Sequence, residues 1–195
     1  RAHHAAIQDV LGLLEREVAA TRVGAAGPRG AVAQAEIRGV IATAYDHYDS
    51  RASDPQLHTH VVVANRVQTV RDGKWRTLDS RALHGAITGL SEHYNAVLTD
   101  HLAVLLGVEW EARERGAGRS TAWEIAGVPQ NLMDEFSSRT RDIELVKDRL
   151  VAEYLAKHGR QPSAKLLWQF RQQATLATRP PKETHSLRAL TQDWR

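Results

Sequence analysis

Apolar residues recur at two different periods along this chain, and the change of period predicts the order of its helices and strands. A helical period runs through residues 3–21 and again, over a longer stretch, through residues 80–106. Alternation of apolar and polar side chains at residues 37–45 indicates a strand. Residues 58–64 form the most strongly β-favouring segment, because three valines follow one another there. We therefore expect a helix, two strands and, further along, a long helix.

Turn-forming residues separate these elements and add two hairpins. The pair Asp72-Gly73 is a strong signal for a tight turn between two strands, and a Gly-Ala-Gly stretch at residues 116–118 gives a similar signal. Residues 24–30 are expected to form a loop after the first helix. The hairpins predicted on this basis pair residues 67–70 with 75–78 and residues 108–113 with 120–125.

The last third of the chain has helical periodicity, and its final residues are expected to form a short helix or a frayed tail. Helices are predicted over residues 130–136, 138–158 and 163–178. This order of strands, long helix, strands and helices indicates an α+β fold with a mostly antiparallel sheet. We expect a sheet-containing, metal-binding part at residues 1–130 and a helical extension at residues 131–195.

Composition narrows the classes of function that the chain can have. The 195 residues contain no cysteine, which excludes disulfides and thiolate metal sites. No apolar run is long enough to span a membrane, and the first residues do not resemble a signal peptide, so we expect a cytoplasmic protein. The formal charge is only +3, but basic residues cluster, either in a solvated loop or as a contact for nucleic acid. One cluster consists of Arg66, Arg71, Lys74, Arg76 and Arg81, and another of Arg113, Arg115 and Arg119.

Three of the ten histidines have a spacing that suits a metal site. His58 and His60 are two residues apart on a predicted strand, so both imidazoles leave the same face. His47 ends the preceding strand, and the turn-rich segment Asp49 to Pro55 would return the chain to this pair. Three neutral imidazoles can share one divalent metal ion and leave coordination positions open. Half-exposed strand histidines without a metal are the alternative.

The sequence around these histidines resembles the three-histidine motif of MobF-type conjugative relaxases, which belong to the HUH endonuclease superfamily. The most specific part of the motif is Pro55-Gln56-Leu57-His58-Thr59-His60-Val61-Val62, within residues 45–65. Other segments that resemble the family lie along nearly the whole chain, at residues 72–79, 123–129, 136–139 and 177–182 and in the helix that contains Tyr94. The resemblance implies the antiparallel palm of an HUH relaxase.

The resemblance also implies a role in nicking and rejoining single-stranded DNA at a plasmid transfer origin. In the family, a tyrosine attacks one phosphodiester to give a 5′-phosphotyrosyl link and a free 3′-hydroxyl. His47, His58 and His60 would hold a metal ion that binds the scissile phosphate, with Mg²⁺ or Mn²⁺ expected in the cell and Zn²⁺ or Ni²⁺ as alternatives. Relaxosome or coupling proteins would be further partners. The candidate DNA-binding residues are Arg51, Arg66, Arg71, Lys74 and Arg76, whereas Trp75 is interpreted as a core residue of its hairpin.

The chain departs from the family pattern at its beginning. The family's nucleophilic tyrosine lies near the start of the relaxase, and nothing that resembles this segment precedes Ala5. None of the four tyrosines present matches it. The expectation is therefore a truncated relaxase domain that binds metal, is inactive alone, and self-associates through a sheet edge that a missing strand leaves open. An inactive DNA-binding or accessory module and a three-histidine metallohydrolase are the alternatives.

Overall fold

The structure is a computed structural model, and it describes residues 1–24, 31–114, 121–181 and 183–195. These residues form two compact units. Unit 1 consists of Arg1–Ala44 and Val61–Ala126, and unit 2 consists of Tyr45–His60 and Gly127–Arg195. The turn expected at residues 116–118 and most of the loop expected at residues 24–30 lie outside the described residues.

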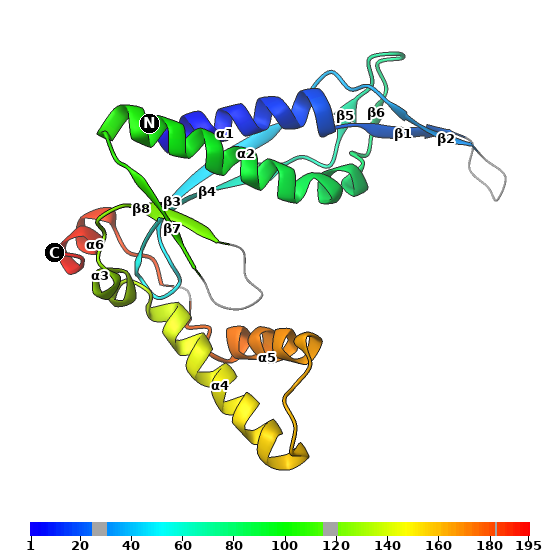
Figure 1. Cartoon of the computed structure of the whole chain (residues 1–195). Helices are drawn as coiled ribbons and strands as arrows, with labels where there is room; N and C mark the ends of the chain where they lie inside the picture. The colour runs from blue at the N-terminus through cyan, green and yellow to red at the C-terminus, as the bar shows by residue number, and fades with distance from the viewer. Residues whose placement is uncertain (25–30, 115–120, 182) are drawn as a thin grey trace. The chain divides into compact units, whose positions relative to one another are not determined.

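Two helices lie side by side in unit 1 (Figure 1). They are α1 (Ala2–Leu13), which continues into the π-helical segment η1 (Leu14–Val18), and α2 (Ser80–Leu106). The side chain of Asp79 caps α2 by accepting a hydrogen bond from the amide of Arg81, and Gly107 ends the helix in the left-handed conformation. Both predicted helices are confirmed, although the helical run from α1 ends before residue 21.

The reason for this early end is an antiparallel pair of short strands that the sequence does not predict. β1 (Thr21–Gly24) pairs with β2 (Val32–Ala35). Thr21 is only 1% exposed, and its hydroxyl donates to the carbonyl of Thr77 at 2.7 Å. Tertiary packing at Thr21 therefore takes precedence over helical periodicity, and strands of four residues are too short to show a clear period of two.

The hairpin predicted at Asp72-Gly73 is confirmed. β5 (Val67–Gln68) pairs antiparallel with β6 (Trp75–Arg76), and Gly73 has the positive φ of 66° that favours glycine in such a turn. Trp75, however, is 54% exposed, so its interpretation as a hairpin core residue is wrong. The strands are only two residues long, and the buried positions of the hairpin are occupied by Val67 on β5 and by Thr69 directly after it.

A bidentate ion pair closes this hairpin. Two guanidinium nitrogens of Arg76 lie 2.7 Å from the two carboxylate oxygens of Asp72. The hydroxyl of Thr69 and the amide of Lys74 donate to the same carboxylate. The hydrogen bond from Arg76, followed by that from Thr69, holds the pKa of Asp72 well below its usual range. The folded hairpin therefore favours the ionised form of Asp72.

Two further hairpins complete the described strands. β7 (Trp110–Arg113) pairs antiparallel with β8 (Ala122–Ile125), as predicted. β3 (Ala42–Asp49) and β4 (Pro55–Val63) are hydrogen-bonded neighbours joined by a short turn. Within the described part of the chain the strands form four two-stranded ladders. The α+β class with antiparallel pairing is thus confirmed.

Unit 2 contains the C-terminal helices. They are α3 (Gln130–Glu135), α4 (Ser138–His158), α5 (Ala164–Ala177) and α6 (Leu187–Asp193), as predicted. α4 and α5 pack as a helical hairpin, with Ile143 and Ala174 buried (Figure 1). The guanidinium group of Arg139 donates to the carbonyls of Thr175 and Thr178 at 2.9 and 3.2 Å, which ties the start of α4 to the end of α5. None of the helices in the described residues is long and apolar enough to cross a membrane.

The two units divide the chain differently from the domains expected at residues 1–130 and 131–195. The second boundary of unit 1, after Ala126, lies close to the expected one. Residues 45–60, which carry the histidine motif, nevertheless group with the C-terminal helices. The assignment of the metal-binding function to an N-terminal domain therefore stays a prediction.

We predict that Asp72→Asn destabilises unit 1 at neutral pH and makes its stability less dependent on pH. Because the pKa of Asp72 is lower in the folded than in the unfolded chain, its contribution is fully present above about pH 4 and is lost as the pH falls toward the folded-state pKa. Urea unfolding of the wild type, Asp72→Asn and the control Asp100→Asn between pH 2.5 and 7 would measure this. An equal difference between wild type and Asp72→Asn at all pH values would contradict the prediction.

Candidate metal centre

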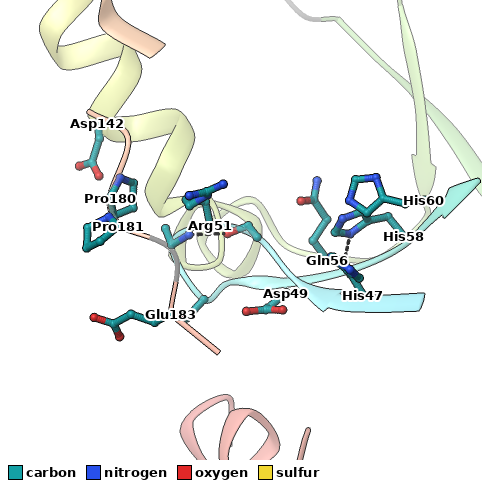
Figure 2. A pocket seen from close by; sticks show the side chains of 13 residues that line it. His47, Asp49, Arg51, Gln56, His58, His60, Asp142, Pro180, Pro181 and Glu183 are labelled. Carbon is teal, nitrogen blue, oxygen red and sulfur yellow. Dashed lines mark hydrogen bonds between the residues drawn. The ribbon is translucent and has the colours of Figure 1, made fainter. Parts of the chain in front are cut away.

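Strands β3 and β4 carry the three histidines of the motif within unit 2. His58 and His60 alternate with Thr59 on β4, so their rings leave the same face of the strand. The hydroxyl of Thr59 donates to Asp46 Oδ1 on β3 at 2.6 Å and thereby links the two strands. His47 follows Asp46, and its ring lies beside those of His58 and His60 (Figure 2).

The three imidazole rings converge as the sequence predicts. The ring centroids are 5.2 Å apart for His47 and His58, 4.6 Å for His47 and His60, and 5.0 Å for His58 and His60. One nitrogen from each ring lies within 4.8 Å of the other two. Ligand nitrogens about 2.0–2.1 Å from a shared ion are roughly 3.0–3.4 Å apart, so modest ring rotations would complete the site. The donor set therefore fits a divalent ion with three imidazole ligands.

The ring orientation of His58 is fixed from its other side. Nδ1 of His58 lies 2.8 Å from the carbonyl oxygen of Gln56. A carbonyl only accepts, so in the neutral ring Nδ1 carries the proton and Nε2 keeps its lone pair. This is the arrangement that prepares a histidine for a metal ion.

The turn between the ligand strands is built from hydrogen bonds of two serines. The Ser50 amide donates to the carbonyl of Asp54 at 2.8 Å, and the Ser53 amide donates to the carbonyl of Ser50 at 3.0 Å. The Ser50 hydroxyl accepts from the amides of Ala52 and Asp54 at 3.1 and 3.3 Å. Ser53 has a φ of 63°, in the left-handed region that residues other than glycine rarely adopt. The predicted turn is confirmed, and it returns β4 alongside β3.

The triad opens into a cavity of about 570 Å³ within unit 2 (Figure 2). Figure 2 shows the histidines at one end of the cavity and Pro180 and Pro181 at the other, with Arg51 between them. Asp49 and Glu183 also line it. Its volume lies in the range of about 300–1,000 Å³ that is usual for small-molecule sites. The cavity thus combines three imidazoles, a guanidinium group and carboxylates.

The sequence does not predict which residues form the wall of the cavity opposite the histidines. It is formed by Asp142 on α4 and by the segment after α5 that contains Pro180, Pro181 and Glu183. These residues show no ligand spacing in the sequence. The family resemblance at residues 177–182 points to Pro180 and Pro181, and no sequence signal points to Asp142 or Glu183.

The five candidate DNA-binding residues are divided between the units. Arg51 lines the cavity of the triad in unit 2. Arg66, Arg71 and Lys74 are exposed in unit 1, in or next to the β5–β6 hairpin. Arg76 belongs to the same hairpin, but its guanidinium group is bonded to Asp72. The surface of this hairpin therefore presents exposed cations beside the exposed ring of Trp75.

Comparison with known proteins gives the family context of the site. The family model of the TrwC relaxase matches residues 1–195. The multifunctional conjugation protein TraI of Escherichia coli is 34% identical over 151 residues, and its counterpart in strain K12 is 31% identical over 153 residues. Each alignment covers 73% of this chain but only 8% of the relative.

Solved structures of the conjugative relaxase TrwC in complex with OriT DNA have a similar fold over 99% of this chain, at 28% identity. The metal-free structure gives a TM-score of 0.72, the metal-bound structure 0.72 and the copper-bound structure 0.73. This chain covers 61%, 60% and 59% of those chains, respectively. The chain thus spans about three fifths of the length of these solved relaxases.

We predict that His58→Ala abolishes tight binding of a single divalent ion. Loss of a group that only hydrogen-bonds to a metal ligand costs about 10–100-fold in affinity, so loss of a ligand itself should cost at least about 100-fold. Isothermal titration with Ni²⁺ measures this, with His84→Ala as the control because His84 is exposed on α2. Unchanged binding by His58→Ala, or an equal loss in both variants, would contradict a centre at the triad.

Proposed function

The chain belongs to the TrwC relaxase family, and from this membership we propose that its three histidines hold a divalent metal ion for nicking and rejoining single-stranded DNA at a plasmid transfer origin. The observation that carries the proposal is the convergence of His47, His58 and His60 at one end of a cavity. The TrwC relaxases compared above contain OriT DNA in metal-free and metal-bound structures. The reaction proposed is a phosphodiester transesterification.

Different residues of the cavity would bind different parts of a DNA phosphodiester backbone. A divalent ion held by the triad would supply Lewis-acid stabilisation of charge on a phosphate oxygen. In the neutral ring, the bond between His58 and the Gln56 carbonyl places the proton on Nδ1 and leaves Nε2 as the nitrogen available to the ion. Arg51 can donate two parallel hydrogen bonds to a phosphate of the same strand. We assign the triad to the ion and Arg51 to the DNA backbone.

The identity of the ion follows from availability rather than from the donor set. Mg²⁺ or Mn²⁺ is proposed for the cell, and three imidazoles would also accept Zn²⁺ or Ni²⁺. The similarity to a copper-bound TrwC structure fits a site with such broad metal acceptance. The cytoplasmic location expected from the sequence stays a prediction.

The β5–β6 hairpin of unit 1 is proposed as a second contact for the DNA. Arg71 and Lys74 can neutralise phosphates, and the exposed indole of Trp75 offers a face on which a base can stack. Arg66 lies just before β5 and is exposed as well. Arg76 is proposed to stabilise the fold of the hairpin rather than to bind DNA, because its guanidinium group forms an ion pair with Asp72.

None of the four tyrosines is proposed as the nucleophile. Burial raises the pKa of Tyr94, whose hydroxyl also lies 2.7 Å from Nδ1 of His3, and a raised pKa disfavours the attacking phenolate. Tyr154 packs against other rings on α4 and α5. Tyr45 and Tyr48 lie on the ligand strand β3. A covalent adduct between these 195 residues and an oligonucleotide, stable on a denaturing gel, would contradict this assignment.

The β3–β4 ladder is proposed as a surface for self-association, while relaxosome and coupling proteins remain proposed partners. In the described part of the chain, β3 and β4 pair only with each other, so each leaves one edge open. Ile41, Tyr45, Leu57 and Val62 on or next to these strands are each more than half exposed. Open edges that carry apolar side chains favour the addition of another strand. A second copy of this chain is the simplest source of such a strand.

We predict that Mn²⁺ strengthens non-covalent binding of single-stranded DNA by the wild type and by His84→Ala, but not by His58→Ala. The reason is that phosphate would then share the ion with the triad. Fluorescence anisotropy of a labelled oligonucleotide, with and without Mn²⁺, measures the effect. A metal-independent affinity in the wild type would remove the support for a phosphate on this centre.

The same titration tests the hairpin contact through Trp75→Ala. Loss of one stacking contact should weaken binding by about 1–3 kcal/mol and leave the Mn²⁺ effect in place. Trp123→Ala is the control, because Trp123 is an exposed tryptophan on β8 of the same unit. Equal losses in the two variants would show that stacking is not specific to the β5–β6 hairpin.

We predict that the chain forms a dimer or larger oligomer, which Val62→Lys converts to the monomer of 21.7 kDa. A lysine on β4 opposes strand addition by charge, as edge lysines do in natural sheets. Size-exclusion chromatography with light scattering measures the mass, and Val104→Lys on α2 serves as the control for a charge added at an exposed valine. A wild-type monomer at all concentrations would rule out self-association.

A further inference from the structure

The turn that joins the ligand strands is held by two side chains from distant parts of unit 2. Nε1 of Trp194 donates to the carbonyl of Ser53 at 2.7 Å. The hydroxyl of Ser138, at the start of α4, donates to Asp54 Oδ1 at 2.8 Å. Both hydrogen bonds are partly buried, so solvent competes weakly for them. The turn is thus tied to α4 on one side and to the end of α6 on the other.

The hydrogen bond from Trp194 reaches the residue of the turn with the least favourable backbone conformation, which is Ser53. Ser53 has a φ of 63°, and a side chain in the left-handed region is disfavoured relative to the ordinary regions. Such a conformation persists when the surroundings over-determine it. Here they include the internal bond from the Ser53 amide to Ser50 and the external bond from Trp194 to the Ser53 carbonyl.

Packing and capping hold helix α6 in place, so the hydrogen bond from Trp194 can restrict the conformation of the turn. Leu190 on α6 is only 2% exposed, and the hydroxyl of Ser186 caps the helix by accepting from the amide of Ala189. The amide of Trp194 donates to the carbonyl of Leu190 at 3.0 Å, which continues the helical pattern to the tryptophan. The indole therefore reaches Ser53 from a fixed base.

The conformation of the turn decides where the ligands lie. His47 is three residues before Ser50, and His58 is four residues after Asp54, so this turn is the covalent link between the two ligand strands. A change of φ at Ser53 would alter how β4 returns along β3, and with it the separation of the His47 nitrogen from those of His58 and His60. The segment before α6 also lines the cavity, through Pro180, Pro181 and Glu183.

We propose that Trp194 is a positioning residue of the metal centre, whose indole N–H couples the docking of helix α6 to the metal affinity of the three histidines. The proposal rests on the proposed function for the metal centre itself. Because coupling between two sites is reciprocal, a bound ion also stabilises docked α6 by the same factor. The C-terminal helix therefore reports on, and contributes to, the state of the centre without touching the ion.

The first test compares Ni²⁺ affinity in Trp194→Phe and Trp168→Phe by isothermal titration. Phenylalanine keeps an aromatic ring but removes the N–H, so the loss of one hydrogen bond should weaken Ni²⁺ binding about two- to tenfold with unchanged stoichiometry. Trp168 is 62% exposed on α5 of the same unit, so Trp168→Phe should bind as the wild type does. Equal affinity of both variants and the wild type would overturn the proposal. A wild type that binds no Ni²⁺ would instead overturn the metal centre.

The second test starts from the wild type, in which the result does not depend on how well a variant folds. Saturating Ni²⁺ should slow hydrogen exchange of the backbone amides of α6, including that of Trp194, and leave those of α5 unchanged. In Trp194→Phe this protection of α6 should disappear, whereas a merely structural tryptophan would leave it intact. Exchange in α6 that Ni²⁺ does not affect in the wild type would overturn the coupling.

Discussion

The hydrogen-bonded pairing of β3 with β4 is the constraint on which the candidate metal centre depends. Because side chains alternate along a strand, a shift of one residue would turn His58 and His60 away from His47. The hydrogen bond between Thr59 and Asp46 and the turn at Ser50 oppose such a shift. Neither group is a candidate ligand, yet both decide whether the three ring nitrogens converge.

This hairpin depends on the helices of unit 2 because a two-stranded ladder is only marginally stable by itself in water. Ser138 and Trp194 bond to its turn, and the α4–α5 pair gives Ser138 a firm base. In that pair, burial alone would raise the pKa of Glu144, but Lys147 and Arg171 outweigh it and lower the pKa. The ion pair of Glu144 with Arg171 on α5, and that with Lys147 within α4, therefore hold above the ordinary carboxylate range of pH and weaken only in acid.

Sequence reasoning succeeds here where one period or one turn signal governs many residues. The helical period over residues 80–106, the Asp72-Gly73 turn and the two-residue spacing of His58 and His60 are all local signals, and the helix, the hairpin and the converging pair of rings are found in the structure. The strand at Thr21 and the exposure of Trp75 depend instead on tertiary packing. The cavity wall and the hydrogen bond from Trp194 to the turn also depend on tertiary packing. Contacts between residues that are distant in the sequence produce no periodic pattern, so the sequence does not predict them.

Electron–nuclear double resonance of Mn²⁺ bound to this chain together with a single-stranded oligonucleotide would show directly whether the three histidines hold an ion that binds phosphate. We expect ¹⁴N couplings from imidazole ligands and a ³¹P coupling from a phosphate on the same ion. The ¹⁴N couplings should be lost in a variant with alanine at His47, His58 and His60. A ³¹P coupling without any ¹⁴N coupling would place the ion on the DNA rather than on the triad. That result would contradict a three-histidine metal centre acting on a phosphodiester.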